Sequence, residues 1–143
     1  MRHLPLVALL AAALTLAGCG KMKPLPTEPD GGGPPPADAT FTRVQGEVFS
    51  VSCALSGCHA GTAPTGGMNL SAGASYGNIV MVPSTERGDL HRIEPGDPDR
   101  SYLVKKIRGD ADIVGSPMPL IGSLTSAQRQ LVIDWVRRGA PND

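Results

Sequence analysis

The pattern of hydrophobic and polar positions predicts two helices in the middle of the chain. In the first segment apolar residues recur at helical spacing and continue towards Val51: Phe41, Val44, Val48 and Phe49. A second, shorter helix is predicted over 102–108. Ser101 stands where it could cap the start of this helix, and Gly109 follows its last residue.

The same pattern predicts a longer helix near the C-terminus. Thr125 and Gln128 stand at the spacing of a capping box, which marks a helix start. Gly139 and Pro141 end the periodic segment. One face of this predicted helix is apolar: Leu131, Val132, Trp135 and Val136.

Long stretches rich in Gly, Pro, Ser and Asp separate these helices, over 60–77, 82–99 and 110–123. Loops of this length are uncommon in a compact domain unless they serve a function. The chain also holds only one Trp, two Tyr and two Phe, few large side chains for a core. We therefore expect an all-α, loop-rich domain whose core is completed by a bound group.

The first residues predict export and lipidation. Arg2 precedes an apolar run over 4–17, which is shorter than the roughly 20 residues needed to span a bilayer. Residues 1–18 are therefore predicted to be a signal peptide. The run Leu16-Ala17-Gly18-Cys19 resembles the lipobox of bacterial lipoproteins, which implies acylation of Cys19. A plain signal peptide, with Cys19 incidental, is the alternative.

Composition divides the rest of the chain into a tether and a domain. Prolines and glycines dominate 19–39, a composition that predicts a disordered tether, and the domain is predicted over 40–143. Lys and Arg together number 13, as do Asp and Glu, so the net charge is zero. This balance argues against nucleic acid as a partner. We expect a lipid-anchored protein of the bacterial cell envelope, facing the periplasm or on the outer membrane.

The segment from Cys53 to His59 carries the main chemical signal. It reads Cys-x₄-Cys-His, whereas the common haem c attachment motif is Cys-x-x-Cys-His. Small or flexible residues in the insert, Ala54, Ser56 and Gly57, could let it bulge while both sulfurs keep their reach. A short-loop disulfide between Cys53 and Cys58 is the other interpretation, because export permits disulfides.

Five motifs in order resemble the c-type cytochromes, and most closely the small single-haem domains of the planctomycete-type cytochrome c family. The resemblance covers about 41–140, and the Cys-x₄-Cys spacing is its one departure. The motifs are Phe49 four residues before Cys53, Gly66-Gly67-Met68-Asn69-Leu70, the run from Glu94 to Leu103, Pro117-Met118-Pro119, and the run from Trp135 to Ala140.

This resemblance implies one covalently bound haem c in a cytochrome c-like domain. Cys53 and Cys58 would be the thioether residues, His59 the proximal iron ligand and Met118 the distal ligand. Prolines on both sides of Met118 favour a stiff loop that presents its sulfur. A His/Met pair is typical of electron-transfer haems, and the implied function is one-electron transfer to a redox partner protein that the sequence does not identify.

Several alternatives stay open from the residues alone. Met68, Met81 or His91 could replace Met118 as distal ligand, and Arg92, Lys105 and Arg108 could pair with haem propionates or lie in solvent. Zinc and calcium sites are weakly supported, since neither a second Cys/His cluster nor a calcium loop follows. The rival functions are a haem-free binding module stapled by a disulfide, and a haem sensor or peroxidase-like protein.

Overall fold

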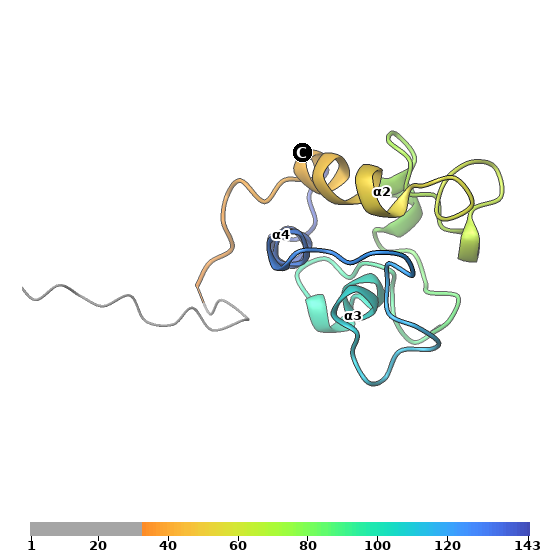
Figure 1. The fold of residues 1–143 in the computed structure, drawn as a ribbon. Helices are drawn as coiled ribbons and strands as arrows, with labels where there is room; N and C mark the ends of the chain where they lie inside the picture. The colour runs from red at the N-terminus through yellow and green to blue at the C-terminus, as the bar shows by residue number, and fades with distance from the viewer. Residues whose placement is uncertain (1–32) are drawn as a thin grey trace, which may run out of the picture. The chain divides into compact units, whose positions relative to one another are not determined.

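The computed structural model describes residues 33–143 of the chain. The predicted signal peptide, Cys19 and most of the predicted tether lie outside the described residues. Short helices connected by long loops make up the described part, and α3 and α4 lie beside each other (Figure 1).

The first predicted helix is present, but it changes from an α-helix to a π-helix after its first turn. Its first turn, α1 (Phe41–Val44), begins after Thr40, whose Oγ1 accepts a hydrogen bond from the backbone N–H of Arg43 at 3.3 Å. The chain continues directly into a π-helix, η1 (Gln45–Cys53), and the N–H of Ala54 donates to the carbonyl of Phe49 at 2.7 Å. Single-turn π-bulges are frequent at functional sites, and this nine-residue segment is longer than such a bulge. Here the π-helix ends at Cys53.

The two other predicted helices are confirmed. Helix α3 (Tyr102–Arg108) ends at Gly109, which takes the left-handed conformation with φ 77°. Helix α4 (Ser126–Arg137) begins at the predicted capping box, in which Thr125 and Gln128 exchange side-chain and backbone hydrogen bonds.

Ser101 is the N-cap residue of α3, at the predicted position, but its side chain makes no capping hydrogen bond. Its Oγ donates to the Asp97 carbonyl at 2.8 Å and accepts from the Glu94 N–H at 2.9 Å. Both bonds join the Ser101 hydroxyl to residues that precede α3, so the hydroxyl does not bond the N–H groups of the first turn of the helix.

Three short elements occupy the predicted loops: η2 (Thr65–Gly67), α2 (Ser75–Ile79) and η3 (Pro98–Arg100). Within residues 33–143 there is no strand, only isolated bridges such as that between Val80 and Ile93. The same residues hold no helix long and apolar enough to cross a membrane. The expected all-α, loop-rich class is therefore confirmed.

From the sequence we expect the first and last helices to pack together, with Phe49 near Trp135. The core does form where these helices meet, and both side chains are fully buried there. The ring that lies against Trp135, however, is that of Phe41, with centroids 5.3 Å apart. Phe41 also meets Phe49 at 6.4 Å and Tyr76 at 5.1 Å, so the aromatic cluster forms around Phe41. Ala39, just before the predicted domain start, is buried in the same core.

Candidate functional site

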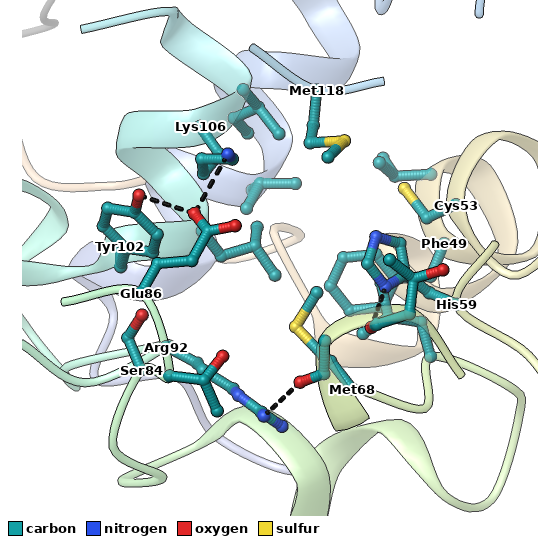
Figure 2. Close-up of a pocket in the computed structure, with 18 residues that line it drawn as sticks. Phe49, Cys53, His59, Met68, Ser84, Glu86, Arg92, Tyr102, Lys106 and Met118 are labelled. Carbon is teal, nitrogen blue, oxygen red and sulfur yellow. Dashed lines mark hydrogen bonds and ion pairs between the residues drawn. The ribbon is translucent and has the colours of Figure 1, made fainter. Parts of the chain in front are cut away.

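A cavity of about 110 Å³ opens beside this core, between η1, α3, α4 and the loops around residues 59–70, 84–92 and 118 (Figure 2). One water molecule needs about 10–15 Å³ on the same measure, so the cavity can take a larger group. Much of its wall is apolar: Val48, Phe49, Leu70, Leu103, Ile107 and Val132. Such a wall favours an apolar ligand.

The Cys-x₄-Cys-His segment forms a compact turn at one side of the cavity. The Cys58 N–H donates to the Leu55 carbonyl at 2.9 Å, and Gly57 has a φ of 78°, which favours glycine. The His59 N–H then donates to the Cys53 carbonyl at 3.2 Å. The two extra residues are thus absorbed in the turn, and Cys53 and His59 stay adjacent across it.

The His59 ring is oriented by a backbone carbonyl. Its Nδ1 lies 3.1 Å from the carbonyl oxygen of Thr65, and only an N–H can make that bond. In the neutral ring the lone pair is therefore on Nε2, the other ring nitrogen. Metal-binding histidines are held by this kind of hydrogen bond, which fixes the tautomer and the ring plane.

The two cysteines differ in position. Both are free thiols and half-buried, but Cys53 lines the cavity and Cys58 does not. Burial, with a smaller contribution from Cys58, raises the pKa of the Cys53 thiol to about 11. Cys53 is therefore a protonated thiol at neutral pH and a poor nucleophile for thiol exchange.

Met118 reaches the cavity from a loop fixed on α3. Its N–H donates to the Lys106 carbonyl at 2.9 Å. Pro117 packs on the end of α3, where a β-carbon on Gly109 would lie 3.4 Å from its Cγ. The Met118 side chain is half-buried, packs against the core and lines the cavity.

Of the other three candidate distal ligands, only Met68 lines the cavity, and it is also half-buried against the core. Met81 is 54% exposed, and His91 places its Nδ1 2.5 Å from a Glu94 carboxylate oxygen. Neither Met81 nor His91 is among the lining residues. Two thioether sulfurs and one imidazole therefore share the cavity wall (Figure 2).

A polar network on another wall was missed in the sequence. Glu86 accepts hydrogen bonds from the Tyr102 hydroxyl at 2.7 Å and from Lys106 Nζ at 3.1 Å, and Lys106 also donates to the Val114 carbonyl at 2.8 Å. Burial opposes ionisation of Glu86, but these bonds and the Lys106 charge prevail and lower its pKa. The i,i+4 spacing of Tyr102 and Lys106 on the predicted helix was the available signal.

Only one of the three cations considered as propionate partners lines the cavity. Arg92 lines the cavity and is buried, whereas Lys105 and Arg108 do not line it. Lys105 Nζ lies 3.1 Å from Asp112, and Arg108 Nη2 lies 2.7 Å from Asp110. Arg92 is thus the one of the three that the fold brings to the site.

The donors in this cavity fit a haem iron. His59 offers an imidazole with a free Nε2, Met118 or Met68 offers a thioether, and much of the surrounding wall is apolar. A bare metal ion fits poorly, because within the described part of the chain no three His, Cys, Asp or Glu side chains come together.

Comparisons with known proteins gave no match to a family model, to a curated protein or to a solved structure. The likeness to single-haem cytochromes therefore depends on the ordered motifs and on the cavity.

Proposed function

We propose that this protein is a lipid-anchored, single-haem c-type cytochrome of the bacterial cell envelope and that it transfers one electron at a time between redox partners. The observation that carries the proposal is the orientation of His59. Its Nδ1–H is committed to the Thr65 carbonyl, which leaves Nε2 free beside a cavity that Met118 also lines. This is the arrangement expected of a proximal histidine and a distal methionine.

Four residues would hold the haem. Cys53 and Cys58 would form the thioethers, His59 the proximal bond and Met118 the distal bond. When bound, the haem supplies a one-electron iron couple, and a methionine ligand raises its potential. The residues of the chain would orient His59 through the Thr65 carbonyl, hold the Met118 loop on α3 and supply an apolar wall.

A haem assay on the full chain tests the proposal. The protein is expressed with a haem-maturation system, and covalent haem is measured by pyridine haemochrome on denatured protein. We expect one haem per chain. His59→Ala should lose most of it, whereas His91→Ala, a histidine outside the cavity, should retain it.

Wild-type protein without haem would contradict the proposal. In that case, peptide mapping that found a Cys53–Cys58 disulfide would favour the haem-free binding module. Haem-loaded wild-type protein that binds carbon monoxide rapidly would instead favour a sensor or a peroxidase-like protein.

A further inference from the structure

Arg92 is a buried cation in the wall of the cavity. The residue is 8% exposed, and its guanidinium donates to three backbone carbonyls. Nη1 bonds the carbonyls of Gly67 at 3.2 Å and Asn78 at 2.8 Å, and Nη2 bonds that of Gly66 at 3.0 Å. These bonds tie α2 and η2 together and fix the guanidinium plane.

The same bonds leave one edge of the guanidinium available. An arginine has five N–H donors. The three bonds are made by Nη1 and Nη2, so Nε–H has no partner among the described residues, and in a guanidinium it shares one edge with an Nη2–H. Among residues 33–143 no fully buried side-chain nitrogen or oxygen lacks a partner, so the unpartnered Nε is in contact with accessible space. Two parallel N–H groups are the geometry that binds a carboxylate in bidentate fashion.

The charge of Arg92 also lacks a counter-charge. No carboxylate of the described residues lies within ion-pair distance of it, whereas Lys106, the other cation of the cavity wall, is paired with Glu86 at 3.1 Å. Burial lowers the pKa of the Arg92 guanidinium. A buried cation of this kind is stabilised by an anion that offers matching hydrogen-bond acceptors.

We infer that the Nε–Nη2 edge of Arg92 binds a carboxylate of the molecule that occupies the cavity. The inference rests on the proposed function, under which this carboxylate is a haem propionate. Arg92 would then be a positioning residue, which holds the carboxylate at a place on the wall separate from His59 and Met118.

A purely structural role for Arg92, as a clamp on the loop carbonyls, is the competing explanation. Arg129 provides a matched control. It too donates to a backbone carbonyl, that of Leu124 at 2.6 Å, it has no carboxylate partner among the described ion pairs, and it does not line the cavity. Removal of either arginine removes hydrogen bonds to backbone carbonyls, but only the change at Arg92 would also remove the partner of a ligand carboxylate.

The test uses haem-loaded full-length protein with the propionate carboxyl carbons labelled with ¹³C. Redox-difference infrared spectra are recorded for the wild type, Arg92→Gln, Arg92→Lys and Arg129→Gln, together with the reduction potential. We expect Arg92→Gln to shift the labelled carboxylate bands and to lower the potential, because an unpaired carboxylate favours the oxidised iron. A tenfold change in the redox equilibrium, about 59 mV for one electron, is the expected size.

Arg92→Lys keeps the charge but loses the two-pronged edge. It should shift the bands with a smaller change in potential, and Arg129→Gln should change neither. If Arg92→Gln does not load haem, the bands of Arg92→Lys decide the matter. Unchanged labelled bands in the loaded Arg92 variants would reduce Arg92 to a loop clamp while leaving the cytochrome proposal intact. Wild-type protein without haem would overturn both.

Discussion

Replacing each cavity methionine by alanine distinguishes ligation from packing. Met118 and Met68 are both half-buried and both pack against the core, so each truncation removes similar apolar contact. Full burial makes such a change cost about 2–5 kcal/mol, and half-burial suggests about 1–2 kcal/mol for each variant. The two variants should therefore lose similar stability in denaturant titrations.

Their iron chemistry should differ. If Met118 is the distal ligand, the oxidised wild type is low-spin and shows the weak far-red sulfur-to-iron band. Met118→Ala should abolish that band, lower the potential and open the iron to carbon monoxide. Met68→Ala should keep the far-red band, the wild-type potential and an iron closed to carbon monoxide, although its stability falls by a similar amount.

The assay is visible and far-red spectroscopy of both oxidised variants, followed by carbon monoxide binding after reduction. If Met68→Ala loses the band and Met118→Ala keeps it, Met68 is the distal ligand. If both variants keep it, our assignment of the distal side is wrong even if the family resemblance is right.

Two further predictions concern the anchor and the cavity wall. Cys19→Ser should move the protein from the membrane to the soluble fraction; soluble wild-type protein with an unacylated N-terminus would refute the lipoprotein reading. Glu86→Gln should lower the free energy of unfolding by about 1–3 kcal/mol in denaturant titrations, because the Lys106 side chain, only 10% exposed, loses its carboxylate partner. Glu47→Gln, which removes the carboxylate of an exposed pair with Arg43, should lower it far less. The pKa of Glu86 is lowered on folding, so its stabilisation is present above the unfolded value of 4.5 and should fade as the pH falls through the lower folded value. An equal loss in both variants would contradict this assignment.

Local signals explain which helices could be predicted. The capping box at Thr125 and the glycine at position 109 act within a few residues, so α4 and α3 appear where the sequence places them. Helix α2 is a single turn that depends on distant contacts: the Tyr76 hydroxyl donates to the Ala140 carbonyl at 2.9 Å, across 64 residues of chain. No pattern within the segment itself reports such a bond.

The residues of the site likewise differ in whether a local motif marks them in the sequence. Cys53 and His59 belong to one motif, and prolines mark Met118, so these residues could be chosen from the sequence. Arg92 could be named only as one of three cations, with Lys105 and Arg108, because it lies in a polar loop typical of solvated surface. Its burial comes from the carbonyls of Gly66 and Gly67, which lie about 25 residues earlier in the chain.

The cavity also makes the stability of the domain depend on its occupant. The aromatic cluster around Phe41 and Trp135 joins α1 to α4, whereas α3 turns Leu103 and Ile107 towards the cavity. An unfilled apolar cavity costs about 24 cal/mol per Å³, which gives about 2.6 kcal/mol for 110 Å³. Haem-free protein should therefore be less stable than loaded protein by at least this order. Hydrogen exchange followed by mass spectrometry should show the loss of amide protection concentrated in 82–123, with α4 affected least. Equal protection of 82–123 in both forms, with a sharp cooperative melt of the haem-free chain, would favour a module that folds without a cofactor.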